Sequence, residues 1–150
     1  MKRIVLALAA LFASATAQAY CVQNELRDRS VLVEQEPHPD PLRRDRILRH
    51  ALKPGEKQCC RFHDLDCNPG GRQNSTLNLS VRIPGVPEYA CGYPAGAEPF
   101  VTVTGGGTLR VVANPRKKSS IPYVVRVRTH DRKDLTGPRG LACPELPKGK

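Results

Sequence analysis

Residues 54–68 read PGEKQCCRFHDLDCN and carry three of the six cysteines of the chain. The leading Pro-Gly pair predicts a turn, because proline presets one φ angle and glycine permits a positive one. An extended segment over residues 56–63 would follow, with successive side chains on opposite faces. On such a strand Cys60 faces the core and Cys59 faces outward, toward a loop. The two adjacent cysteines are therefore expected to form disulfides with different partners.

The N-terminal residues have the organisation of a secretory signal peptide. A positively charged start precedes nine apolar residues at 4–12 and an A-x-A cleavage motif at 17–19. The apolar run is shorter than the ~20 residues that cross a bilayer, so no transmembrane segment is expected. The sequence predicts removal of residues 1–19. It also predicts a single secreted β-rich domain over residues 20–150, extracellular or periplasmic, with a mobile C-terminal tail.

All six cysteines lie in the exported part of the chain. They are Cys21, Cys59, Cys60, Cys67, Cys91 and Cys143. An even number in an exported protein predicts three disulfides, each stabilising the fold by about 2 to 4 kcal/mol. The alternative is a zinc site made by Cys60, His63 and Cys67, since tetrahedral zinc prefers thiolate and imidazole ligands. Their spacing matches no zinc ribbon or finger, and an oxidising compartment favours disulfides.

The exported chain is strongly basic. Loss of Lys2 and Arg3 lowers the 24 basic residues to 22, against 14 acidic residues, and leaves a net charge of +8. A chain of this charge favours anionic surroundings. Export argues against nucleic acid, so the expected partners are an anionic surface, a glycan or an acidic protein. Solubility alone is the alternative explanation of the charge.

Alternation of apolar and polar residues predicts the strands. The clearest case is residues 76–83, where four aliphatic residues alternate with polar ones and give one buried and one wet face. The other expected strands are residues 21–26, 30–34, 47–52, 56–63, 100–104, 108–113 and 121–128. With no amphipathic helix evident, the expected fold is all-β: a single small antiparallel β-sandwich, or a partly open barrel, of about seven to eight strands stapled by disulfides.

Two connections carry specific expectations. Gly105 to Gly107, between two strand signals, predicts a hairpin with a three-residue glycine loop. Residues 84–99, rich in proline and glycine, predict a long surface loop that Cys91 must pin down.

The first functional hypothesis is a secreted binding protein that recognises an anionic surface or an acidic partner through a basic face. The strand and turn pattern is expected to gather five basic residues near one edge of the fold. They are Arg116, Lys117, Lys118, Arg126 and Arg128.

The second hypothesis is an inhibitor, or a toxin-like or antimicrobial effector, that presents a loop strapped by a disulfide. Residues 88–94 around Cys91 would be the presented segment, and Tyr89 and Tyr93 would contact the partner. A loop held in place loses less entropy on binding, which raises affinity. The alternative is that the two tyrosines pack the loop onto the core.

No catalytic residue stands out, and the chain is not expected to be an enzyme. His63-Asp64 and His130-Asp131 are adjacent pairs, yet neighbours on a strand point apart, and no G-x-S-x-G motif accompanies them.

No cofactor is expected either, apart from a weak calcium signal. Asp64, Asp66 and Asn68 supply oxygens at alternate positions, which suits calcium. The alternative is a turn whose side chains bind their own backbone. Asn74 and Asn78 also lie in N-glycosylation sequons, which matter only in a host that uses that route.

Overall fold

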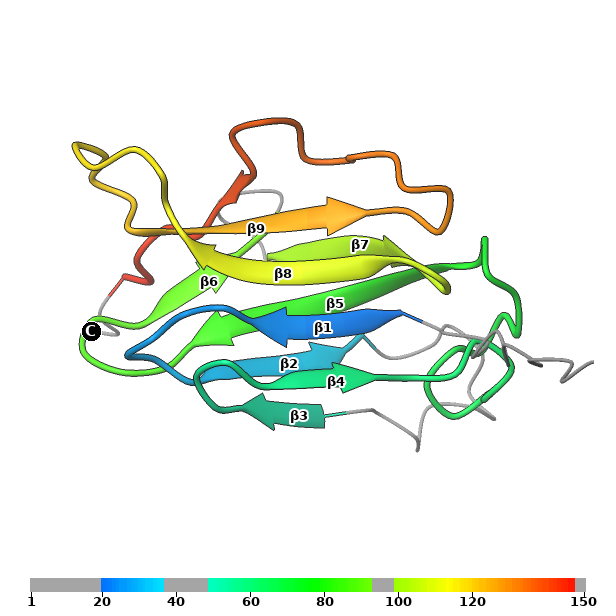
Figure 1. The fold of residues 1–150 in the computed structure, drawn as a ribbon. Helices are drawn as coiled ribbons and strands as arrows, with labels where there is room; N and C mark the ends of the chain where they lie inside the picture. Colours follow the sequence, from blue (N-terminus) through cyan, green and yellow to red (C-terminus); the bar gives the residue numbers. More distant parts are fainter. Residues whose placement is uncertain (1–19, 37–48, 93–98, 148–150) are drawn as a thin grey trace, which may run out of the picture.

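Two β-sheets lie face to face around the hydrophobic core (Figure 1). The computed structural model describes residues 20–36, 49–92 and 99–147, and these ranges contain ten strands. The first sheet has the order β10 (Leu141–Ala142), β9 (Tyr123–Arg128), β8 (Thr108–Ala113), β1 (Cys21–Asn24) and β4 (Lys57–Cys59). The second has the order β3 (Arg49–Leu52), β2 (Val31–Gln35), β5 (Thr76–Ile83) and β6 (Tyr89–Cys91), with β7 (Phe100–Thr104) also paired to β5. The predicted β-sandwich is confirmed.

The described ranges hold more strands than the seven to eight predicted. The additions are β6, inside the stretch expected to be a loop, and β10, beyond the last expected strand. Both are short, with three and two residues, so neither carries an alternating pattern. In contrast, β4 has three residues where eight were expected, because the chain bends at Cys60 into a loop closed by the Cys60–Cys67 disulfide.

The core follows the predicted alternation most clearly in β5. Leu77, Leu79, Val81 and Ile83 are buried between the sheets, while Thr76, Asn78 and Arg82 are exposed on the opposite face. The pattern arises because successive side chains of a strand point to opposite sides. Burying each of these aliphatic side chains contributes about 1.5 to 3 kcal/mol. This strand also joins the second sheet together, since β2 lies on one side of it and β6 and β7 on the other.

The sequence predicted antiparallel pairing throughout, and one pair of strands departs from it. β1 lies antiparallel to β4 but parallel to β8, with Val22 opposite Leu109 and Gln23 opposite Arg110. A parallel neighbour requires a long connection, and here 83 positions of sequence separate Asn24 from Thr108. The sequence gives no local signal for a contact made over that distance.

The glycine run does not form the predicted hairpin. β7 pairs in the second sheet and β8 in the first, so residues 105–107 carry the chain from one sheet to the other. These glycines are needed for close approach. A Cβ on Gly105 would lie 2.3 Å from the Arg72 carbonyl oxygen, and one on Gly107 would lie 2.5 Å from that of Arg128.

The predicted disulfides are confirmed, and Cys59 and Cys60 have different partners. Cys59 is bonded to Cys21, directly opposite it on β1, and Cys60 to Cys67. The third bond joins Cys91 to Cys143. Cys60 belongs to the core cluster, as predicted. The expectation that Cys59 would be tied to a loop is wrong, because its partner lies on the neighbouring strand.

The predicted turn at residues 54–55 is also confirmed, with Gly55 at a φ of 78°. It carries the chain from β3 in the second sheet to β4 in the first.

The buried side chain of Asn24 fixes this end of the sandwich. Its amide nitrogen donates to the carbonyl oxygens of Arg29 at 2.8 Å and of Leu52 at 3.1 Å.

The predicted signal peptide, residues 1–19, lies outside the described residues. Within the described ranges, no helix has the length and apolar character to cross a membrane. Beyond β9 the chain is described as far as residue 147, and it is attached through β10 and Cys143.

Candidate functional site

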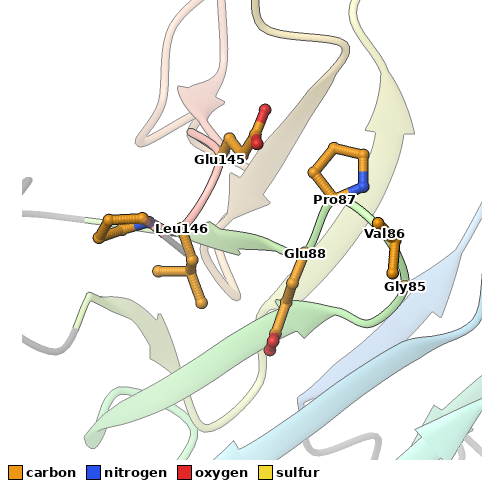
Figure 2. A pocket seen from close by; sticks show the side chains of 7 residues that line it. Gly85, Val86, Pro87, Glu88, Glu145 and Leu146 are labelled. Carbon is orange, nitrogen blue, oxygen red and sulfur yellow. The ribbon is translucent and has the colours of Figure 1, made fainter. Parts of the chain in front are cut away.

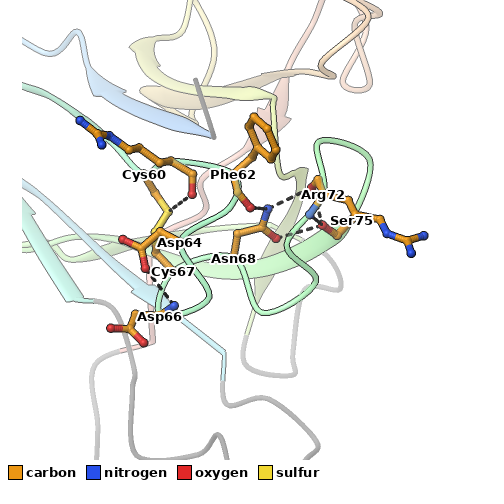
Figure 3. Close-up of a disulfide and its surroundings, with 9 residues drawn as sticks. Cys60, Phe62, Asp64, Asp66, Cys67, Asn68, Arg72 and Ser75 are labelled. Atoms are coloured by element: carbon orange, nitrogen blue, oxygen red, sulfur yellow. Dashed lines mark hydrogen bonds between the residues drawn. A yellow bond between two sulfur atoms is a disulfide. The ribbon is translucent and has the colours of Figure 1, made fainter. Parts of the chain in front are cut away.

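The loop after β4 is organised by the side chain of Asn68, which is fully buried (Figure 3). Its amide nitrogen donates to the carbonyl oxygens of Phe62 at 2.6 Å and Arg72 at 2.9 Å. Its amide oxygen accepts a hydrogen bond from the Ser75 hydroxyl at 2.9 Å. The polar atoms of this side chain therefore serve the loop itself.

Two of the residues considered for calcium, Asp64 and Asn68, direct side-chain oxygens at protein partners. One carboxylate oxygen of Asp64 accepts from the backbone NH of Asp66 at 3.1 Å, which is the turn considered as the alternative. Among the described residues, no group of three or more His, Cys, Asp or Glu side chains is placed to hold a metal ion. Because Cys60 and Cys67 are bonded to each other, the zinc alternative loses both of its thiolates.

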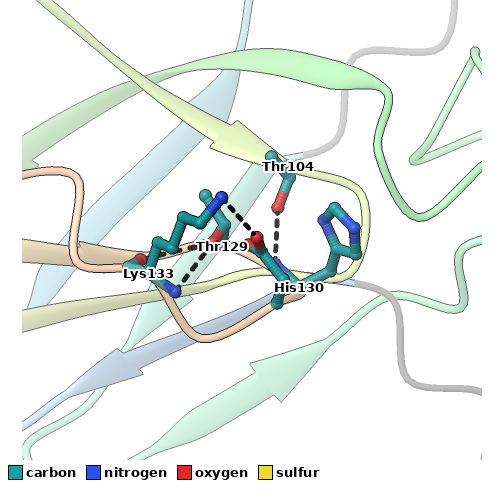
Figure 4. Close-up of polar contacts among 5 residues, drawn as sticks. Thr104, Thr129, His130 and Lys133 are labelled. Atoms are coloured by element: carbon teal, nitrogen blue, oxygen red, sulfur yellow. Dashed lines mark hydrogen bonds and ion pairs between the residues drawn. The ribbon is translucent and has the colours of Figure 1, made fainter.

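The two His-Asp neighbours do not form base-and-acid contacts in the described part of the chain. The carboxylate of Asp131 binds Thr129 and Lys133, while the backbone NH of His130 donates to the Thr104 hydroxyl at 3.1 Å (Figure 4). The ring of His63 packs edge-on against Phe62, with a centroid distance of 5.4 Å. Neither histidine is thus oriented by its neighbouring acid, as a catalytic base would need.

We expect Asp131 to titrate well below an ordinary aspartate. The hydrogen bond from the Thr129 hydroxyl, and then the interaction with Lys133, lower the pKa of Asp131 from 3.8 to about 2. The folded pKa is lower than the unfolded one, so this contribution to stability is present above pH 3.8 and is lost as the pH falls toward 2. Carboxyl-carbon NMR titration measures the midpoint directly. Thr129→Val should move it back toward 3.8, and a wild-type midpoint already at 3.8 would contradict the assignment.

Tyr89, one of two tyrosines proposed for partner recognition, packs on the core. It lies on β6, where its half-buried ring meets the ring of Tyr123 edge-on at a centroid distance of 5.1 Å. This arrangement corresponds to the packing alternative. Tyr93, the other proposed contact residue, lies outside the described residues.

Three of the five predicted basic residues form an exposed, hydrogen-bonded turn between β8 and β9. Arg116, Lys117 and Lys118, here called the basic turn, are all exposed, and none forms an ion pair within the described part of the chain. Asn114 closes the turn. Its amide nitrogen donates to the Ile121 carbonyl oxygen at 2.8 Å, and its amide oxygen accepts from the backbone NH of Arg116 at 3.0 Å.

The other two predicted residues lie further along β9. Arg126 and Arg128 share the outer face of the first sheet, while the alternating Val125 and Val127 face the core. Arg128 is the last residue of β9, at the opposite end from the basic turn (Figure 1). At about 3.3 Å per residue, it lies about 17 Å along the strand from Tyr123. The structure therefore divides the expected single patch into a turn and a strand face.

Sequence reasoning missed three residues that belong with the strand face. Arg126 lies opposite Arg110 on β8, Arg110 opposite Gln23 on β1, and Gln23 opposite Lys57 on β4. We call these four residues the basic row. The alternation of residues 108–113 would have placed Arg110 outward. No sequence signal would have aligned it with Gln23 and Lys57.

Arg110 is held in place by an acidic neighbour. Its Nε and Nη2 atoms donate to the two carboxylate oxygens of Glu25, at 2.5 and 2.7 Å. The hydrogen bond to Glu25 raises the pKa of Arg110 above its ordinary value. A bidentate pair of this kind fixes the orientation of the guanidinium group. It also offsets part of the positive charge at the centre of the row.

An open cleft of about 470 Å³ lies between residues 85–88 and 145–147 (Figure 2). The guanidinium of Arg29 supports its wall by donating to the carbonyl oxygens of Pro84 and Pro87, at 3.3 and 3.2 Å. Its charged lining consists of Glu88 and Glu145, which point in different directions. The cleft therefore does not suit an anionic ligand.

Comparisons of this chain with protein-family models, with curated protein sequences and with solved structures found no match.

Proposed function

We propose that this chain is an exported binding protein that recognises an anionic partner through the basic side chains of β8, β9 and the turn between them. The basic turn carries the proposal. Its three consecutive cations are exposed and have no ion pair within the described residues. Unpaired cations on a surface attract anions and accelerate their association.

The hydrogen-bonded backbone of the basic turn supports recognition over solubility alone. Both polar atoms of the Asn114 side chain are bonded to the backbone of the turn, and the backbone NH of Ser119 donates to the Arg116 carbonyl oxygen at 3.0 Å. Charges that serve only solubility need no fixed backbone beneath them. A fixed backbone lowers the entropy lost on binding, which increases affinity.

Two further observations support the exported, non-catalytic part of the proposal. Three disulfides in a β-sandwich are typical of an oxidising compartment, in agreement with the predicted signal peptide and an extracellular or periplasmic location. In addition, the two His-Asp neighbours make other contacts than a catalytic pair would, as described above.

Neutralising the basic turn should weaken anion binding about tenfold, given about 0.2 to 1 kcal/mol for each exposed charge contact. The variant is Arg116→Gln/Lys117→Gln/Lys118→Gln in the chain from residue 20. Binding to dextran sulfate, to vesicles containing phosphatidylglycerol and to polyglutamate is measured by titration at increasing salt. Wild-type affinity should fall steeply as salt screens these contacts.

The matched control removes the same charge from other surfaces. Arg49→Gln/Lys53→Gln/Arg82→Gln also neutralises three exposed cations, two on the second sheet and one in the turn before β4. We expect it to lower affinity less than about twofold. Wild-type protein that binds none of the three probes at low salt would overturn the proposed function. Equal losses in both variants would show that net charge, and not the basic turn, drives binding.

A further inference from the structure

The outer face of the first sheet presents a straight line of hydrogen-bond donors across four strands. The basic row consists of Arg126, Arg110, Gln23 and Lys57, which are successive partners in the register from β9 to β4. Strands lie about 4.8 Å apart, so the row is about 14 Å long. Its members come from four separate segments, and only the folded sheet brings them together.

The two arginines of the row are held in position. Glu25 fixes Arg110 through two hydrogen bonds, and the Nη2 atom of Arg126 donates to the Pro138 carbonyl oxygen at 3.4 Å. The Nε atom of Arg126 is buried and has no hydrogen-bond partner. Like charges opposite each other on one face repel, and here Glu25 offsets the charge of Arg110. Arg126 has no ion pair within the described residues, so its charge is available to an external anion.

The chemistry of the row also limits the kind of partner. Arginine and lysine only donate hydrogen bonds, and Gln23 adds an uncharged amide between the cations. Large apolar side chains that are exposed in the described part of the chain are Leu65, Val86 and Leu135, and none of them lies in the row. A bilayer would therefore find nothing to insert at this face. An extended chain that carries both carboxylates and hydroxyls matches this row, because Arg126 and Lys57 lie at its two ends and the uncharged amide of Gln23 lies between them.

We propose that the basic row binds an extended acidic polysaccharide of the uronate class, lying across the strands. Carboxylates of the polysaccharide pair with Arg126 and Lys57, and a hydroxyl or ring oxygen accepts from Gln23. This inference rests on the proposed function, because it names the anionic partner. It adds a second set of contacts on the sheet face, beside those that the basic turn makes with the anionic partner.

The test compares oligogalacturonate with polyglutamate, with phosphatidylglycerol vesicles and with neutral dextran, using the chain from residue 20. The row variant is Gln23→Ala/Lys57→Gln, which removes one uncharged and one charged donor. The control is Lys53→Gln/Gln58→Ala, which makes the same chemical changes at two exposed positions outside the row. Oligogalacturonate affinity should fall about tenfold in the row variant and less than about twofold in the control.

Gln23→Ala alone separates recognition from charge. It leaves the net charge unchanged, and loss of one hydrogen bond should lower oligogalacturonate affinity about threefold or more. Binding to polyglutamate and to the vesicles should not change. Thermal midpoints verify that each variant is folded. If the double variant does not fold, the single variant Lys57→Gln, which changes an exposed side chain, takes its place in the comparison.

Each outcome either supports the inference or contradicts it. Equal losses in the row variant and its control, or an affinity for polyglutamate or vesicles equal to that for oligogalacturonate, would overturn it. In those cases the proposed function would still stand if the basic turn is required. If the wild-type protein bound none of the anionic probes, both the proposed function and this inference would be wrong.

Discussion

Replacing Cys91 and Cys143 together by alanine should lower the free energy of unfolding by about 4 kcal/mol. The bond joins residues 52 positions apart, and the entropy that a disulfide removes from the unfolded chain grows with the length of the closed loop. It also joins β6 to the segment after β10. Both strands are too short to be stable without this bond and their neighbouring strands. Since domains of this size are stable by about 5 to 15 kcal/mol, the loss is a large share of the total free energy of unfolding.

The Cys60–Cys67 bond provides the matched control. All four of these cysteines are buried, so replacement by alanine leaves comparable small cavities. The Cys60–Cys67 loop spans only 7 positions, and its removal should cost about 2 kcal/mol. Urea unfolding of both double variants under non-reducing conditions measures the difference. An equal loss in the two, or a larger loss for Cys60→Ala/Cys67→Ala, would contradict the dependence on loop length.

The parts of the fold that could be predicted are those whose signal lies within one segment. The alternation of residues 76–83 predicted β5 correctly, because side chains on a strand change face at every residue. The same parity separated Cys59 from Cys60. That inference needed only the direction of two neighbouring side chains and no knowledge of their partners.

The errors arose where a local signal has two physical explanations. The glycine run was interpreted as a hairpin loop, yet these glycines permit the backbone to pass close to Arg72 and Arg128 while the chain changes sheets. Glycine serves sharp turns and close contacts alike, so the sequence does not distinguish them. Similarly, β6 and β10 form because the neighbouring strands and the Cys91–Cys143 bond position them.

The candidate site was predicted in part. The basic turn follows from three consecutive cations between two strand signals. The basic row depends on pairing between segments far apart in the chain, including the parallel contact of β1 with β8. Register of that kind is determined by the whole core, so Gln23 and Lys57 could be recognised as neighbours of Arg110 only in the folded structure.

Asn68→Asp should be the most damaging single substitution, lowering the free energy of unfolding by about 3 to 5 kcal/mol at pH 7. The side chains have nearly the same shape, but an aspartate has no NH₂ group to donate to the carbonyl oxygens of Phe62 and Arg72. Those oxygens would face a buried carboxylate. Burial and repulsion from the carbonyls disfavour its charged form, so the pKa of this aspartate should rise in the folded state.

The sign of the pH dependence distinguishes this explanation from simple loss of packing. Because the folded pKa would lie above the unfolded value of about 3.9, the variant's deficit relative to wild type should grow as the pH rises from about 4. Below that pH the protonated carboxyl can donate one hydrogen bond and recover part of the loss. Urea unfolding of both proteins across this range measures the difference. A deficit that does not change with pH would contradict a buried charge.

Asn114→Asp supplies the control, because Asn114 also joins two backbone groups through its amide. Its amide nitrogen donates to the Ile121 carbonyl oxygen at 2.8 Å, but the turn is only partly buried and carries Arg116, Lys117 and Lys118. Water and these cations stabilise a carboxylate there, so we expect a loss of only about 1 kcal/mol. A similar loss in both variants would mean that the cost lies in the missing amide donor and does not depend on burial. The larger loss at Asn68 would establish that the loop after β4 is built around a buried amide that binds backbone oxygens.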